Sequence, residues 1–261
     1  MELQATKKKI VIGINSLVST VHAAYSNHVQ LFFKLGRNYP QYDFIFVNPP
    51  RMSIDRMRNM AATVAIQANA DYLIFIDDDV LIPFNFLTSF EKMLDTYDIV
   101  CGNVQIRGYP FDYMMFKWDA ERKGLLTLKT LPKNEIVELD AVGFSCCLIK
   151  VELLRKMNKP YFVTTGNMTE DVFFCLKARD EFPETRMACD SSIVCGHILW
   201  SEVISDFTRE NYTKYYEAMY PEECEAIKKG DLEERFRGEE YLARLKASIT
   251  ESVADATGTA E

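Results

Sequence analysis

The chain has 261 residues, which is enough for a sizeable core and close to the upper size of a single domain. Hydrophobic residues make up 48% and charged residues 26% of the sequence, so a largely disordered chain is excluded. The formal net charge of -8 argues against a nucleic acid partner that is bound through broad phosphate contacts.

The compartment is indicated by two further features. No segment approaches the roughly 18 to 20 apolar residues of a membrane span, and the start of the chain lacks a signal-peptide pattern. The seven cysteines, an odd number without the C-x-x-C spacing of zinc sites, fit reduced thiols better than a disulfide framework. These features predict a soluble, cytoplasmic protein without a transmembrane segment.

The first part of the sequence alternates between strand and helix patterns. Apolar runs predict strands, and amphipathic stretches predict helices, over residues 8–15, 18–35, 42–48, 53–69 and 71–77 in that order. Such alternation predicts an α/β fold with a mostly parallel central sheet that is flanked by helices. In such sheets, ligands bind at the carboxyl ends of the strands.

The second part departs from this alternation. Its patterns predict a helix near 83–95, a strand over 98–106, a hairpin across 125–142, a strand and helix over 143–157, a helix over 170–182 and a last strand over 186–197. Beyond residue 200 the sequence becomes polar and helical. We therefore expect one domain over 1–200, a helical C-terminal extension packed on it over 201–247, and a disordered tail over 248–261.

Three adjacent carboxylates, Asp77, Asp78 and Asp79, follow the apolar run of the third predicted strand. Like charges repel, and carboxylates that leave water need a compensating charge. A divalent cation such as Mg²⁺ or Mn²⁺ prefers carboxylate oxygens and is often shared with substrate phosphates. A solvated turn is the alternative, but the position at the carboxyl end of a buried strand favours a metal site.

Asp77 and Asp79 form a D-x-D motif, and two classes of protein that carry such a motif do not match this sequence. Haloacid-dehalogenase-like phosphatases carry the motif on the first strand, with Thr or Val two positions after the second aspartate. Here the motif follows the third strand, and Leu81 holds that position. An EF-hand calcium loop is excluded because its glycine and its final glutamate are absent.

Two later groups are candidates for the same site. Glu170 and Asp171 precede an amphipathic helix, where acidic residues also complement the helix dipole and Thr169 can form the cap. His197, one of only three histidines, ends the last predicted strand. A lone histidine is more often structural than a ligand, so His197 is a candidate only in combination with the other motifs.

Taken in order, these motifs resemble the landmarks of GT-A-fold, nucleotide-sugar-dependent glycosyltransferases over about residues 8 to 200. The motifs are "RN" at 58–59, "ADYLIFIDDDVLIP", "VGFSCCLIKVELLRKM", "TEDVFFCLKAR" and "CGHI". The chain is similar to compact bacterial and large-virus members of that fold. It lacks the Q-x-x-R-W motif of processive polysaccharide synthases after the 170–182 helix, which argues against polymer synthesis.

The resemblance implies a GT-A (Rossmann-like) fold and a metal-dependent transfer of a sugar from a UDP- or GDP-linked donor to a hydroxyl acceptor, such as a glycan. In such enzymes the outer D-x-D carboxylates hold Mn²⁺ or Mg²⁺ against the donor diphosphate, and a late histidine completes the metal shell. The corresponding metal ligands here are Asp77, Asp79 and His197. Neutral imidazole suits Mn²⁺ better than Mg²⁺.

On the donor side, the resemblance implies that Asp78 accepts a hydrogen bond from the ribose and that Asn15 and Ser16 line the nucleotide. Arg58 either supports the aspartate loop or reaches the diphosphate, and a surface ion pair is a third interpretation of this residue.

On the acceptor side, Asp171, or in its place Glu170, would act as general base in an inverting enzyme and would orient the acceptor in a retaining one. A metal site that ends in histidine is common among retaining members. Two alternatives to a glycosyltransferase remain: a nucleotidyltransferase of related architecture and a non-catalytic module that binds a nucleotide or sugar. "GINSLVST" is a poor match to the glycine-rich phosphate loop of a nucleotidyltransferase.

Overall fold

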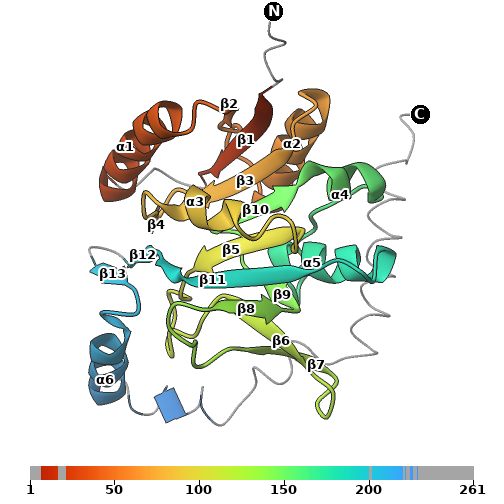
Figure 1. The fold of residues 1–261 in the computed structure, drawn as a ribbon. Helices are drawn as coiled ribbons and strands as arrows, with labels where there is room; N and C mark the ends of the chain where they lie inside the picture. Colours follow the sequence, from red (N-terminus) through yellow and green to blue (C-terminus); the bar gives the residue numbers. More distant parts are fainter. Residues whose placement is uncertain are drawn as a thin grey trace, which may run out of the picture.

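The fold of the chain is shown in Figure 1, a computed structural model. It describes residues 7–16, 22–199 and 202–219 and the positions 221, 224, 225 and 228. The expected tail at 248–261 and most of the expected extension at 201–247 lie outside these residues. Within the described part, no helix is long and apolar enough to cross a membrane.

The centre of the fold is a seven-stranded sheet with the order β2-β1-β3-β10-β5-β11-β8. Its strands are β1 (Lys8–Asn15), β2 (Tyr42–Val47), β3 (Tyr72–Asp77), β5 (Ile99–Asn103), β8 (Ile136–Leu139), β10 (Cys146–Lys150) and β11 (Met187–Val194). All of them except β10 and β8 run in the same direction. The predicted mostly parallel sheet flanked by helices is therefore confirmed.

Helices cover both faces of this sheet (Figure 1). On one face, α1 (His22–Asn38) and α3 (Phe86–Glu91) pack Leu31 and Phe90 into a core with Ile12. On the other face lie α2 (Ile54–Gln67), α4 (Val151–Lys156) and α5 (Glu170–Glu181). A Cβ atom added to Gly13 would lie 3.0 Å from the Cβ of Ala61, so small residues allow α2 to lie close to β1.

The prediction of a hairpin across 125–142 is wrong. The strand β7 (Gly124–Thr127) pairs with β6 (Met115–Asp119), which also pairs with β9 (Ala141–Val142). The strand β8 pairs instead with β11, at the edge of the central sheet. Alternating apolar residues indicate strands, but they do not identify the partner of each strand.

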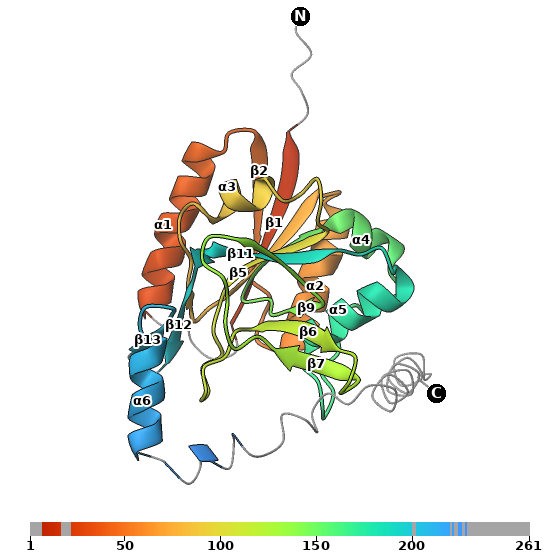
Figure 2. The ribbon, with the colours of Figure 1, turned by 60° about the horizontal axis from the view of Figure 1, so that its bottom comes forward.

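The single last strand expected over 186–197 is in fact two strands. β11 ends at Val194, and β12 (Gly196–Leu199) belongs to a separate sheet, between β4 (Val80–Leu81) and β13 (Glu202–Ile204). His197 therefore pairs with Val80 of β4, the residue that directly follows the three aspartates. The helix α6 (Arg209–Met219) follows, and in Figure 2 α1, the β12–β13 pair and α6 lie along one side of the molecule.

Candidate functional site

The site lies where β1 and β3 end and β4 begins. Asn15, the last residue of β1, is in register with Asp77, the last residue of β3. Asp77, Asp78 and Asp79 lie where β3 turns into β4. Their side chains have different partners, which are Arg58, Ser16 and His197, respectively. The turn therefore connects three separate polar clusters.

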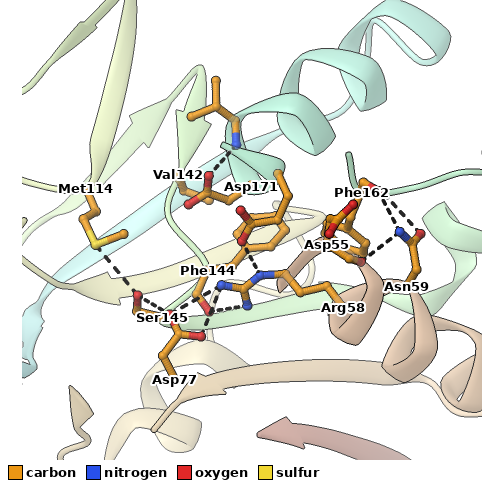
Figure 3. A network of polar contacts seen from close by, with 12 residues as sticks. Asp55, Arg58, Asn59, Asp77, Met114, Val142, Phe144, Ser145, Phe162 and Asp171 are labelled. Carbon is orange, nitrogen blue, oxygen red and sulfur yellow. Dashed lines mark hydrogen bonds and ion pairs between the residues drawn. The ribbon is translucent and has the colours of Figure 1, made fainter. Parts of the chain in front are cut away.

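The first cluster surrounds the buried Arg58 of α2 (Figure 3). Its Nη2 atom lies 3.2 Å from Oδ1 of Asp77, and its Nε atom donates to Oε1 of Glu170 at 2.7 Å. The Oγ atom of Ser145 donates to Oδ2 of Asp77 at 2.7 Å. Burial raises the pKa of Asp77, although Arg58 and Ser145 oppose this effect. Arg58 thus joins the ends of β3 and α5 through a buried ion-pair network.

The second cluster is the contact of Asp78 with Ser16, whose Oγ atom donates to Oδ2 of Asp78 at 2.5 Å. Burial raises the pKa of Asp78, and this hydrogen bond opposes the rise. Two residues that the resemblance assigns to the donor nucleotide are therefore brought together, from the ends of β1 and β3.

The third cluster contains Asp79 and His197. The Nε2 atom of His197 lies 3.4 Å from Oδ1 of Asp79, and Nη1 of Arg107 lies 2.7 Å from Oδ2. The backbone N–H of Ile198 donates to the carbonyl of Asp79 at 2.9 Å, which fixes the two segments against each other. Burial raises the pKa of Asp79, but His197 and Arg107 outweigh it, so that the pKa is lowered overall.

The hydrogen bonding of His197 fits a metal ligand. Its Nδ1 atom lies 2.7 Å from the backbone carbonyl of Gln105, and a carbonyl can only accept. The proton of a neutral imidazole is therefore on Nδ1, so the lone pair of Nε2 faces the carboxylate of Asp79. Two acceptors at this distance need a cation or a proton between them. In metal-bound histidine, one ring nitrogen binds the metal and the N–H of the other usually donates to a group such as a backbone carbonyl, which is the arrangement seen here.

The expected three-ligand set is not preassembled. Among the described residues, no group of three His, Cys, Asp or Glu side chains is close enough to hold a metal ion. Asp77 is turned toward Arg58 and Ser145, which leaves Asp79 and His197 as the pair that faces one point. Oxygen and imidazole nitrogen donors suit Mn²⁺, so this pair fits a divalent cation that takes further ligands from a substrate.

The acidic pair of α5 divides into two roles. Glu170 is held in the ion pair with Arg58. Asp171 instead has local partners: its Oδ1 atom accepts the backbone N–H of Val172 at 2.8 Å, and its carboxylate also accepts a hydrogen bond from the side chain of Thr169. Burial, together with the neighbouring Glu170, raises the pKa of Asp171 to about 6 against the opposing effect of Arg58. A buried carboxyl group that titrates close to neutral pH is a candidate for proton transfer.

Asn15 is buried at the end of β1, and within the described residues neither its Oδ1 nor its Nδ2 atom has a hydrogen-bond partner. Buried amide groups are nearly always paired, and leaving one unpaired destabilises a fold by about 1 to 3 kcal/mol. Its side chain therefore has the capacity to bind a polar ligand at this edge of the sheet.

Several residues at the site were missed by the sequence analysis. Ser145 lies inside the motif "VGFSCCLIKVELLRKM", but nothing in the motif distinguishes it from its neighbours. Arg107 and Gln105 lie in the loop after β5, where no periodic pattern marks them. Asp206 lies between β13 and α6, and its carboxylate accepts hydrogen bonds from Asn103 at 2.6 Å, Gln105 at 2.6 Å and Tyr113 at 2.9 Å. No signal in the sequence connects this segment with β5.

No protein-family model and no curated protein match the sequence. Among solved structures, A197 from STIV is similar over 76% of this chain and 90% of its own, with 22% identity and a TM-score of 0.52. GalNAc-T7 with UDP, GalNAc and Mn²⁺ matches 75% of this chain and 44% of its own, with 12% identity and a TM-score of 0.48. TarS 1–349 of S. aureus with UDP-GlcNAc matches 70% of this chain and 55% of its own, with 16% identity and a TM-score of 0.39.

The likeness to A197 concerns the fold, because the sequence identity is low. It covers most of both chains and agrees with the mixed α/β architecture described above. The residues of the site, rather than this likeness, carry the functional argument.

Proposed function

We propose that the protein is a metal-dependent glycosyltransferase, which moves a sugar from a UDP- or GDP-linked donor to a hydroxyl acceptor. The observation that carries the proposal is the pair of Asp79 and His197. The carboxylate and the Nε2 atom face each other at the carboxyl end of β3, and the pairing of β4 with β12 fixes them there. In a neutral imidazole the Gln105 carbonyl holds the proton on Nδ1, which leaves Nε2 free to bind a cation.

A divalent cation bound there, Mn²⁺ or Mg²⁺, would neutralise the charge that accumulates on the leaving nucleoside diphosphate. Asp79 and His197 would hold this cation, and Asp77 would lie beside it. Arg58, which is buried against Asp77 and Glu170, would keep the aspartate turn in place rather than contact the donor.

The nucleoside part of the donor would lie at the ends of β1 and β3. The amide of Asn15, which has no hydrogen-bond partner in the described part of the chain, offers an acceptor and a donor that suit a base or a ribose hydroxyl. Asp78 and Ser16, which pair with each other, would exchange that hydrogen bond for the ribose. All three residues border the same turn as the proposed cation ligands.

The acceptor would be served by Asp171. In the transfer, the bond between the anomeric carbon and the diphosphate oxygen breaks, the acceptor oxygen bonds to that carbon, and the acceptor proton leaves to a base. The pKa of about 6 supports Asp171 as this base, since it is ionised at neutral pH and still basic enough to take the proton. Glu170 would hold Arg58 and would not take part in the proton transfer.

A two-stage experiment tests the proposal. First, thermal unfolding is measured with UDP, GDP, CDP, ADP and dTDP, with and without Mn²⁺. A ligand at 100 times its Kd stabilises the folded protein by about 2.7 kcal/mol. The absence of a metal-dependent shift with all five nucleotides would overturn the proposal.

The second stage identifies the bond that breaks in a UDP- or GDP-sugar. A glycosyltransferase releases the nucleoside diphosphate and free sugar when water replaces the acceptor. A nucleotidyltransferase supplied with pyrophosphate cleaves the donor diphosphate, transfers the nucleotidyl group to pyrophosphate and yields nucleoside triphosphate and sugar 1-phosphate. A binding module yields none of these products. The Asp79→Asn variant is the control, since it should lose turnover in parallel with the metal-dependent thermal shift.

A further inference from the structure

The two outer aspartates of the turn are each paired with an arginine, but the two arginines differ. The side chain of Arg58, on Asp77, is 3% exposed and also contacts Glu170 and the carbonyl of Phe144. The side chain of Arg107, on Asp79, is 52% exposed, and in the described part of the chain Asp79 is its one ion-pair partner. Arg58 is therefore fixed, whereas Arg107 can leave its partner at little cost.

The loop that carries Arg107 has a fixed base and an open tip. Gln105 pairs with Tyr113 across the loop, and the N–H of Ile106 donates to the carbonyl of Asp112 at 2.8 Å. At the tip, Arg107 is followed by Gly108, where an added Cβ would have no atom within 4 Å. The guanidinium group can therefore change its direction without a movement of β5 or of the Gln105 carbonyl that orients His197.

Arg107 and a divalent cation would compete for the same carboxylate. Oδ2 of Asp79 faces Arg107, and Oδ1 of the same group faces Nε2 of His197. A divalent cation bound by Asp79 and His197 would lie close to the guanidinium and repel it. With the cation come the phosphates of the donor, and a guanidinium fork matches phosphate oxygens in a two-pronged hydrogen bond.

We propose that Arg107 exchanges partners during donor binding: it pairs with Asp79 in the empty site and moves to the donor diphosphate when a divalent cation occupies Asp79 and His197. This inference rests on the proposed function and adds a donor-binding residue to it. Arg107 thus opposes the binding of the cation alone and favours the binding of the cation together with the diphosphate. Removal of Arg107 should change these two affinities in opposite directions.

The test measures Mn²⁺ binding from the loss of the electron paramagnetic resonance signal of free aqueous Mn²⁺, so it does not depend on activity. For Arg107→Gln, the affinity for Mn²⁺ alone should rise about two- to fivefold, the effect of removing a partly exposed ion pair. The affinity for UDP or GDP at saturating Mn²⁺ should fall about tenfold or more, since a charged hydrogen bond to phosphate is lost. Arg107→Lys, which keeps the charge but loses the fork, should bind Mn²⁺ alone like the wild type and still bind the nucleotide less tightly.

The matched control is Arg186→Gln. The side chain of Arg186 is exposed to a similar degree as that of Arg107 and forms an ion pair with Glu138 at 2.9 Å. This pair lies beside the start of β11 and therefore at the other end of the sheet. Arg186→Gln should leave both affinities unchanged. If Arg107→Gln leaves both affinities unchanged or shifts both in one direction, or if Arg186→Gln reproduces its pattern, the exchange is wrong while the proposed function stands. A wild-type protein that binds Mn²⁺ neither alone nor with a nucleotide overturns both.

Discussion

Oδ1 of Asp79 lies 3.4 Å from Nε2 of His197, although one residue follows the third strand of the central sheet and the other follows its last parallel strand. The antiparallel pairing of β4 with β12 creates this contact. Because the histidine proton is held by the carbonyl of Gln105, the contact is complete only with a cation or a proton between the two groups.

This relationship predicts strong non-additivity. Asp79→Ala and His197→Ala should each weaken Mn²⁺-dependent nucleotide binding. The double variant should bind only slightly less tightly than the more damaged single variant, because the two residues act as one unit. Nucleotide titration with and without Mn²⁺ measures the three effects, and circular dichroism checks the fold. Losses that simply add would assign the two residues to separate sites.

The raised pKa of Asp171 predicts a pH profile. A base must be ionised, so kcat/KM should fall about tenfold per pH unit below a pKa of about 6. Asp171→Asn should lower transfer on the order of 10²-fold or more and leave donor affinity unchanged. Exposed Asp95→Asn is the control and should behave as the wild type. An equal loss of donor binding in Asp171→Asn would instead assign the residue to the donor site.

The same carboxyl group should oppose stability. Burial raises its folded pKa above the usual value of an aspartate, so the folded state binds the proton more tightly than the unfolded state. The contribution to stability is fully present below the unfolded pKa and is lost as the pH rises through about 6. Asp171→Asn should therefore raise the melting temperature at pH 8 and change it little at pH 3.5. Equal shifts at the two pH values would contradict this explanation.

Arg58 should be essential for stability. Arg58→Met would leave Asp77 and Glu170 buried without their partner, and removal of one member of a buried ion pair typically costs about 3 to 5 kcal/mol. Denaturant unfolding measures the loss. Arg186→Gln, which breaks an exposed pair, should cost no more than about 1 kcal/mol. A similar small loss for Arg58→Met would mean that the buried network does not hold the turn.

Asn15→Leu should have opposite effects on stability and binding. The substitution removes two buried polar atoms that have no hydrogen-bond partner among the residues the structure describes, so the free protein should gain about 1 kcal/mol or more in its free energy of unfolding. Nucleotide affinity should fall about tenfold if the amide serves the donor. Mn²⁺ affinity in the absence of nucleotide is the internal control and should be unchanged. Unaltered nucleotide binding would remove Asn15 from the donor site.

The sequence predicts the fold well where the information is local. The strands that end at Asn15 and Asp77 are continuous apolar runs. Strands and helices alternate between them, and this order indicates the parallel arrangement that is observed. β7 pairs with the neighbouring β6, which lies in an aromatic-rich section where no strand was predicted. The partner of β8 was wrongly predicted because β11 lies far along the chain, and pairing between distant segments leaves no periodic trace. The same limit applies to Asp206, which reaches Asn103 from far along the chain.

For the candidate site, residues at strand ends could be found from the sequence, whereas their partners could not. The triple aspartate indicated a missing positive charge, and the structure supplies two arginines at this turn. Arg58 was noted because it lies in a motif of the resembled family. Arg107 lies in an irregular loop, and only its position in space shows that it contacts Asp79.

The pairing of β4 with β12 also has a consequence for folding. This pairing closes a long loop of chain. Contacts between residues far apart in the sequence form slowly, because the chain loses conformational entropy on closing the loop before the contacts stabilise it. The helices and the β1–β3 core depend on closer neighbours and should therefore form earlier. During refolding, the capacity to bind Mn²⁺ should appear after the recovery of helical circular dichroism, so that the metal acts as a reporter of the completed chain topology.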